Sequence, residues 1–311
     1  MLTANLNQYR QQLMGLSIIF VLLYHLYVSS SFSDDLVMFK DGFVGVDFFL
    51  VLSGLGLCYS FNNNTLKRFY SRRITRIIPL FFLQVILYNT VFIIQHKTEN
   101  PYEALLNLMS DMSMMTYFGY GGGKFFNWYV TAILILYILF PILYKLVEKT
   151  KTYSYIFVGL LSIIISANYS IEWRYDCLIS RIPSFIFGIA LYHSKDDKKQ
   201  VRNILLVSLV FWIYAYTHCL SHFLISALFA PVLLQFVCTW RQYVENRNTF
   251  VEKVMVWFGR YSYEIYISNA FTCSVVTKIP NLNIPILTIV YVVFSILFGF
   301  LFIMISRKYL R

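Results

Sequence analysis

The sequence predicts an all-α protein, a polytopic membrane bundle of about ten transmembrane helices with both termini in the cytoplasm. Three observations lead to this fold class: an apolar composition, a series of about ten apolar runs, and an uneven distribution of Lys and Arg between them. Of the 311 residues, 58% are hydrophobic and only 13% are charged, whereas soluble domains carry about 25% charged residues. Because one span needs about 20 apolar residues, ten spans leave no room for a large soluble domain.

The apolar runs are separated by charged or polar breaks, which place the predicted spans. They cover about residues 11–31, 43–61, 77–95, 126–146, 153–168, 178–193, 203–218, 221–240, 257–276 and 285–306. A basic amphipathic segment, 66–79, precedes the third span, and a longer polar connection, about 96–125, follows it. The first run lacks a small-residue cleavage site, so we expect it to be a span and not a signal peptide.

Lys and Arg residues fall mainly in alternate connections. Nineteen of the 26 lie on the side that holds both termini, and five lie on the other side. The positive-inside rule assigns the richer side to the cytoplasm. This distribution also explains the net charge of +11, so no nucleic-acid partner is predicted.

The five cysteines are scattered along the chain with no CxxC pair. Cysteine is a small apolar residue that packs well inside membrane helices. We therefore expect no metal site and no required disulfide.

Several ionisable residues lie at membrane depth, where such a group is costly and marks a candidate functional site. His25 lies in the outer half of the first span, Asp47 near the start of the second, and Arg181 near the outer end of the sixth. For Asp47 the alternative is a helix N-terminal charge stabilised by the macrodipole. For Arg181 it is an interfacial side chain that extends its charge to water.

The cytoplasmic connection before the third span concentrates Arg72, Arg73 and Arg76 within about one helical turn. Guanidinium groups bind phosphates through paired hydrogen bonds, which lysine does less well. The cluster predicts a site for a phosphate-rich cytosolic ligand. The alternative is topological anchoring with attraction to anionic lipid.

Three segments together resemble a known family. They are Met14 to His25, ending in histidine; Gly42 to Gly54, GFVGVDFFLVLSG; and Phe69 to Pro79, FYSRRITRIIP. In this order and spacing they resemble the acyltransferase-3 family, bacterial integral-membrane O-acyltransferases that modify surface sugars. Weaker similarities lie at Asn127-Trp-Tyr129, at Arg181 to Gly188 and at Gly259 to Asn269. The resemblance covers most of the chain and implies a single membrane-embedded acyltransferase domain, 1–311, in the bacterial cytoplasmic (inner) membrane.

The chain departs from the family at two positions. The family usually has Arg eleven residues before the first-helix histidine, where this chain has Met14. Arg10 lies one turn earlier on the same helix face and is a candidate substitute. The last weak motif often ends in His, and here it ends in Asn269, whose amide can hydrogen-bond but cannot titrate.

The resemblance implies transfer of an acyl group, most often acetyl, from cytosolic acyl-CoA to a hydroxyl of a surface or lipid-linked glycan. The cofactor expectation is none bound, with acetyl-CoA as co-substrate held by Arg72, Arg73 and Arg76. His25 would be the general base, because the ordinary pKa of imidazole is near neutrality. Asp47 is a candidate to orient His25. Candidates for acceptor binding or oxyanion stabilisation are Arg10, Ser53, Trp128, Arg181 and Asn269.

Two other function classes stay open. Polar groups at midplane also fit a transporter or flippase of a lipid-linked glycan, although we find no internal repeat. The departures at Met14 and Asn269 also allow a catalytically silent scaffold of an envelope assembly. Besides lipid, acyl-CoA and the glycan acceptor, the expected partners include a glycan-synthesis enzyme or an extracytoplasmic acyl-acceptor protein.

Overall fold

The computed structural model describes residues 2–29, 35–96, 100–120, 127–243, 250–276 and 284–309. Every regular element in these ranges is a helix, which confirms the all-α class. Six helical segments are long and apolar enough to cross a membrane: Arg10–Ser29, Val37–Asn62, Leu66–Ile94, Trp128–Thr150, His222–Tyr243 and Ile286–Lys308. The count of ten spans and the side of the termini stay predictions.

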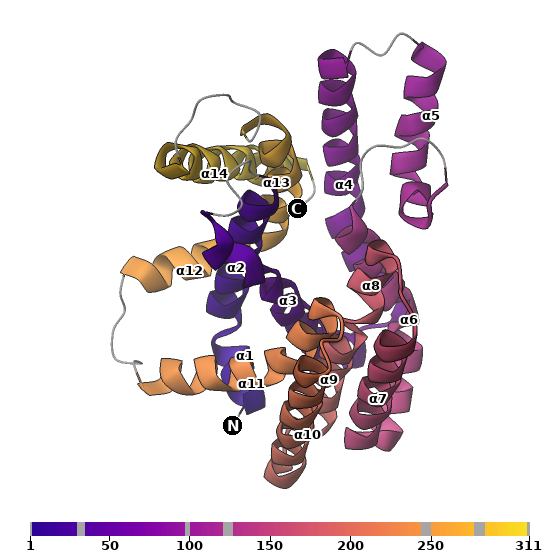
Figure 1. Ribbon diagram of the computed structural model, residues 1–311, viewed down its shortest axis with the longest axis vertical. Coiled ribbons are helices and arrows are strands. Elements are labelled where there is room, and N and C mark those ends of the chain that lie inside the picture. The colour runs from indigo at the N-terminus through magenta and orange to yellow at the C-terminus, as the bar shows by residue number, and fades with distance from the viewer. Residues whose placement is uncertain are drawn as a thin grey trace. The chain divides into compact units, whose positions relative to one another are not determined.

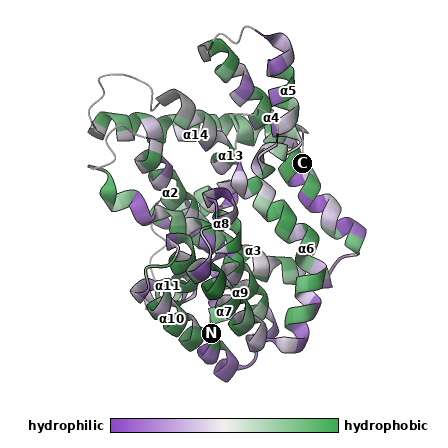
Figure 2. Cartoon of the chain, turned by 45° about the vertical axis from the view of Figure 1, so that its right-hand side comes forward, coloured by the Kyte–Doolittle hydropathy of each residue, from purple (hydrophilic) through white to green (hydrophobic). Residues whose placement is uncertain are grey.

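The helices that the structure describes are labelled in chain order in Figure 1. They are α1 (Leu2–Gln8), α2 (Arg10–Ser29), η1 (Val37–Phe43), α3 (Val44–Asn62), α4 (Leu66–His96), α5 (Pro101–Met112), η2 (Met115–Phe118), α6 (Trp128–Thr150), α7 (Thr152–Asn168), α8 (Trp173–Ile179), α9 (Ile182–His193), α10 (Lys198–Thr217), α11 (His222–Tyr243), α12 (Phe250–Arg260), α13 (Ser262–Val276) and α14 (Ile284–Tyr309). Figure 2 shows that hydrophobic residues dominate most of these helices.

Each predicted span overlaps a helix or a pair of consecutive helices. The sixth span corresponds to α8 and α9, and the ninth to α12 and α13. The basic segment and the third span form one continuous helix, α4, with Pro79 inside it. The longer polar connection expected at about 96–125 contains α5 and η2 where the structure describes it.

Helix α5 begins with a strong local signal that the sequence analysis overlooked. Asn100 caps it by accepting a hydrogen bond from the Tyr102 backbone N at 3.0 Å, and Pro101 occupies the first turn. Both features are typical of helix N-termini. At its other end, Asp111 is buried and accepts hydrogen bonds from Asn89 of α4 at 2.9 Å and from Thr116 at 2.7 Å. These bonds hold α5 and η2 against α4.

The residues group into two compact units. Unit 1 comprises 1–21, 41–65 and 136–260, and unit 2 comprises 22–40, 66–135 and 261–311. Unit 1 contains α3, α7, α8, α9, α10 and α11, and unit 2 contains α4, α5, α13 and α14. The single domain expected at 1–311 stays a prediction.

Helices α3 and α9 form a close crossing in unit 1, and glycine makes it possible. A Cβ at Gly54 would lie 2.4 Å from the Phe185 carbonyl oxygen, and one at Gly188 would lie 2.2 Å from the Val51 carbonyl oxygen. Real side chains cannot occupy such space, so each helix presents bare backbone to the other. Small residues at crossings are typical of membrane helices, where close backbone approach supplies the packing energy.

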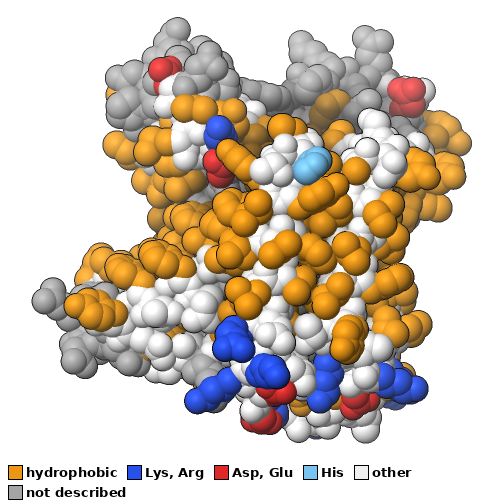
Figure 3. Space-filling view, turned by 60° about the horizontal axis from the view of Figure 1, so that its bottom comes forward, with side chains coloured by type: hydrophobic (Ala, Val, Ile, Leu, Met, Phe, Trp, Pro, Cys, Tyr) orange, Lys and Arg blue, Asp and Glu red, His pale blue; other side chains and the backbone are white. Residues whose placement is uncertain are grey.

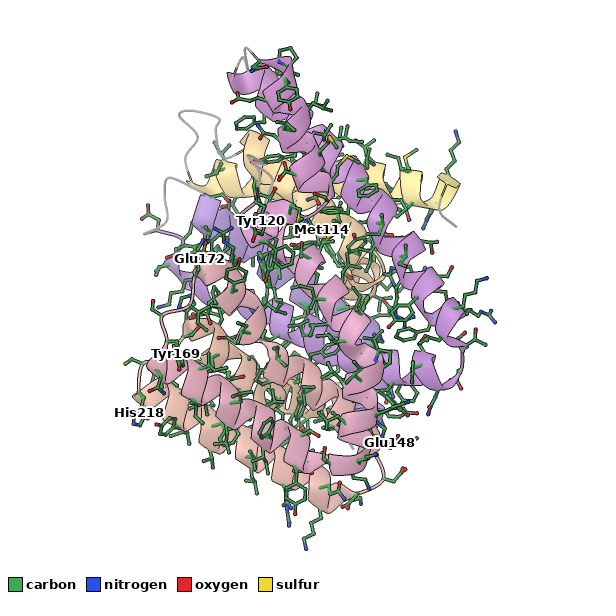
Figure 4. The ribbon with its side chains drawn as sticks, turned by 90° about the vertical axis from the view of Figure 1, so that its right-hand side faces the viewer. Met114, Tyr120, Glu148, Tyr169, Glu172 and His218 are labelled. Carbon is green, nitrogen blue, oxygen red and sulfur yellow. The ribbon has the colours of Figure 1, made fainter. Side chains whose placement is uncertain are left out.

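The two ends of the unit 1 helices carry different polar side chains. Glu148 lies at one end of this unit, and Tyr169, Glu172 and His218 lie toward the other (Figure 4). The first end collects the Lys side chains at the starts of α7 and α10, whereas Ser221 joins Ser166 and Asp176 at the second. At the basic end, hydrogen bonds from the backbone N of Gln200 and Lys199 lower the pKa of the partly buried Asp197 carboxyl.

A space-filling view shows Lys and Arg side chains gathered at one edge of a broad hydrophobic surface (Figure 3). An apolar band beside a basic rim is the pattern that lipid and its interface favour.

Unit 2 is built around α13. This helix packs against α14 and against α4, and α4 also packs against α5. Figure 1 shows α4 and α5 as neighbouring helices. The Tyr263 hydroxyl of α13 donates to the Ile77 carbonyl of α4 at 2.8 Å. That bond fixes α4 relative to α13. Each of these two helices carries polar side chains inside unit 2.

Candidate active site

The imidazole of His25 lies in unit 2, on the last turns of α2, and is half-buried. Its Nδ1 lies 2.5 Å from the Oδ1 of Asn269 on α13. Asn269 is fully buried and donates from Nδ2 to the Tyr291 hydroxyl of α14 at 2.5 Å. The Cys273 Sγ lies 3.3 Å from that same hydroxyl. Three helices therefore hold one imidazole through a buried amide.

The asparagine determines which ring nitrogen carries the proton. Since Nδ2 of Asn269 donates to Tyr291, the amide oxygen faces His25, and an amide oxygen only accepts hydrogen bonds. Nδ1 of His25 must then carry the hydrogen, which leaves the lone pair on Nε2. A neutral histidine held in this tautomer has its second nitrogen ready to accept a proton.

A second polar chain lies beside the imidazole. The ring of Tyr266, on α13, lies 6.4 Å from that of His25. Its hydroxyl donates to Asn127 Oδ1 at 2.9 Å, and Asn127 Nδ2 donates to Gln84 Oε1 at 3.0 Å. Tyr129 packs edge-on against Tyr266 at 5.0 Å. Helices α2, α4, α6 and α13 thus bring an imidazole, a phenol and two amides together in unit 2.

Asp47 and Arg181 meet in unit 1. Arg181 Nε lies 3.4 Å from Asp47 Oδ1, and the two side chains are 1% and 0% exposed. Ser184 donates to Asp47 Oδ1 at 3.1 Å and Ser226 to Oδ2 at 2.6 Å. The guanidinium also lies over the Phe223 ring, 4.6 Å from its centroid. The buried Asp47 carboxylate on α3 is thus linked to Ser184 on α9 and to Ser226 on α11, and Arg181 supplies the opposite charge.

Of three further predicted residues, two lie in unit 1 and one lies in unit 2. Arg10 packs against α3 in unit 1, where a Cβ at Gly56 would lie 2.5 Å from an Arg10 Nη atom. Ser53 is half-buried on α3 in the same unit. Trp128 opens α6 in unit 2 and contacts Tyr129 edge-on at 5.9 Å. Trp128 is therefore next in the chain to two members of the His25 network.

The three arginines lie on the first turns of α4, in unit 2. Arg72 and Arg76 are exposed, while Arg73 is partly buried. Arg73 Nη1 donates to the Phe69 carbonyl at 2.6 Å, and its guanidinium stacks on the Phe69 ring at 3.8 Å. The two exposed groups present cationic donors to any ligand, and the third is held against the helix.

Sequence reasoning identified His25 and Asn269 but did not assign roles to Gln84, Asn127, Tyr266 or Tyr291. Asn127 and Tyr266 lie inside segments already noted as weak family similarities. Gln84 carried a usable signal, because it is a lone amide in the apolar run Ile77 to Tyr88. Tyr291 lies among many span tyrosines, so no sequence feature distinguished it.

Comparison with known proteins identifies the family of this chain. The model of the acyltransferase-3 family, described as an acyltransferase domain, matches residues 12–307. The chain belongs to the acyltransferase-3 family and is a membrane acyltransferase.

A protein of Acidianus two-tailed virus named "Putative acetyltransferase ORF330" is 25% identical over 274 residues, which cover 82% of this chain and 80% of that protein. No solved structure matches the chain.

Proposed function

We propose that this enzyme transfers an acetyl group from cytosolic acetyl-CoA to a hydroxyl of a surface or lipid-linked glycan, with His25 as the general base. The observation that carries the proposal is the His25–Asn269–Tyr291 arrangement. A neutral imidazole with Nδ1–H anchored has Nε2 available to take a proton from an acceptor hydroxyl. The amide of Asn269 thus has the orienting role that the sequence analysis considered for Asp47.

The proposed reaction has two steps, and one proton is transferred in each. The acceptor oxygen attacks the thioester carbonyl carbon while its proton moves to His25 Nε2. The tetrahedral intermediate then collapses, the carbon–sulfur bond breaks, and the same proton passes to the CoA thiolate. General-base catalysis contributes about 100- to 10,000-fold to such a reaction, so we expect the enzyme to depend strongly on His25.

The proposal includes a topology of about ten spans with cytoplasmic termini in a bacterial inner membrane. In that topology Arg72, Arg73 and Arg76 meet the CoA phosphates on the cytosolic side, and His25 meets the acceptor in the outer half of the bilayer. The exposed guanidiniums of Arg72 and Arg76 support the first contact, because phosphate is recognised through such donors. An extracytoplasmic acyl-acceptor protein would receive the acyl group, or a glycan-synthesis partner would supply the glycan acceptor.

The test supplies membranes containing the enzyme with radiolabelled acetyl-CoA. Label in polysaccharide or release of CoA supports the proposal, whereas a transporter or a scaffold gives neither. His25→Ala should lower transfer at least 100-fold without lowering the amount of protein in the membrane. His218→Ala is the matched control, because His218 is an exposed histidine stacked on Tyr214. Near-normal transfer by His25→Ala would contradict the proposed mechanism.

A further inference from the structure

Gln84 carries a buried donor that the mechanism described so far does not use. Its side chain is 2% exposed on α4. Oε1 accepts from Asn127, but Nε2 has no acceptor within hydrogen-bond distance in the part of the chain that the structure describes. Leaving a buried donor unpaired costs about 1–3 kcal/mol. Groups of this kind in native proteins call for a specific explanation, such as a ligand or an ordered water.

The network around Asn127 determines which way the Gln84 amide points. Asn127 Oδ1 receives two donors, the Val130 backbone N–H at 3.1 Å and the Tyr266 hydroxyl at 2.9 Å. The Asn127 side chain therefore keeps its oxygen on that side and turns its NH₂ toward Gln84. Since this NH₂ donates, the Gln84 atom that faces it must be the oxygen. The free end of Gln84 is thus an NH₂ group with two hydrogens to donate.

The same helix links this donor to the basic segment. Arg73 and Gln84 are eleven residues apart on α4, which is about three helical turns and about 16 Å along one face. The α4 helix is continuous between them. A ligand held by its phosphates at the start of α4 and extended along this face would bring its far end to Gln84. Acyl-CoA has this form, with phosphates at one end and a thioester carbonyl at the other.

We propose that Gln84 Nε2 donates a hydrogen bond to the carbonyl oxygen of the acyl thioester, and to the oxyanion that forms when the acceptor attacks. This inference rests on the proposed function and adds a catalytic residue to it. An acceptor-only carbonyl fits a donor-only NH₂ group, and the bond strengthens as charge develops on the oxygen. Tyr266 and Asn127 hold the amide in place, and no proton leaves Gln84 during the reaction.

The sharpest test measures binding of two unreactive CoA analogues to the purified full-length enzyme. In the first, a methylene replaces the thioester sulfur, so the carbonyl stays but cannot be transferred. In the second, a methylene also replaces the whole carbonyl group, so no acceptor oxygen remains. Wild-type enzyme should bind the ketone about tenfold more tightly. Gln84→Leu should bind both analogues equally, and Gln84→Met should repeat that result.

Two controls separate a lost contact from a damaged protein. Gln84 variants should bind free CoA as the wild type does, because the phosphates are held elsewhere on α4. Gln235→Leu should keep the tenfold preference, because Gln235 lies on α11 in unit 1 and bonds to Thr239. In the transfer assay Gln84→Leu should lose about 100- to 1,000-fold in kcat, which is typical of removing an oxyanion donor.

The failures are distinguishable. If Gln84→Leu and Gln84→Met still prefer the ketone tenfold, the role of Gln84 is wrong while the donor site stands. If wild-type enzyme binds neither analogue nor CoA, the proposed donor itself is wrong.

Discussion

The two units bury polar clusters of opposite character. In unit 1 the Asp47 carboxylate and the Arg181 guanidinium neutralise each other, and two serine hydroxyls donate hydrogen bonds to the carboxylate. In unit 2 the cluster around His25 is built from neutral amides and phenols, the imidazole is half-buried, and Gln84 keeps an NH₂ group with no acceptor among the described residues.

This difference supports our proposal that the unit 2 cluster does the chemistry. A buried ion pair is held by its own attraction, and removing one partner leaves an uncompensated charge. Neutral amides and hydroxyls cost less free energy to bury than charged groups do. Through hydrogen bonds they hold a neighbouring group in one orientation. The unit 1 cluster therefore suits the joining of three helices, and the unit 2 cluster suits the positioning of a base and a substrate. The following experiments, from the largest expected effect to the smallest, would break or sharpen this assignment.

Replacing Asp47 alone should cost the most stability. Asp47→Leu leaves Arg181 buried without its partner, and we expect a loss of about 3–5 kcal/mol in the free energy of unfolding. The double variant Asp47→Leu with Arg181→Met should recover most of that loss and most of the transfer activity. Thermal unfolding in detergent and the transfer assay measure the two effects. A double variant that is stable but inactive would show that the pair takes part in chemistry.

Replacing Asn269 should affect the reaction more than the fold. Asn269→Leu removes the acceptor that holds Nδ1–H of His25, and we expect a 10- to 100-fold loss of transfer, as for other groups that orient a functional histidine. Asn269→Asp keeps an acceptor oxygen and should recover activity. A purely structural asparagine would instead give equal rates in the two variants once their thermal stabilities are matched.

We expect the smallest effect from replacing single basic residues, one in each unit. We expect Arg73→Ala to raise KM for acetyl-CoA about tenfold, because each charge-assisted bond contributes about 1.5–3 kcal/mol and solvent weakens those near the surface. Lys149→Ala, at the basic end of unit 1, should leave KM unchanged. Both are measured by varying acetyl-CoA at constant acceptor. Equal effects of the two variants on KM would show that the α4 arginines do not bind acetyl-CoA and would favour a role in membrane topology.

Where the sequence predicted well, the signal was local. Apolar runs identified the helices because each span must satisfy its own backbone hydrogen bonds and present apolar side chains to lipid. The α5 helix was missed because it is short and lies in a polar stretch, although Asn100 and Pro101 mark its start. His25 was found because an imidazole is conspicuous among apolar neighbours, and Asn269 because it ends a segment that resembles a motif of the family.

Composition and motifs by themselves determined the class of this protein: a helical membrane acyltransferase with one imidazole in its first span. Only the tertiary structure decided which polar groups meet. It paired Asp47 with Arg181 and His25 with Asn269, and it brought Gln84, Asn127 and Tyr266 into one network. The physical reason is that a side chain's depth and helix face follow from its own segment, whereas its partners follow from how distant segments pack. His25 and Asn269 are 244 positions apart, and no local pattern specifies a contact over that separation.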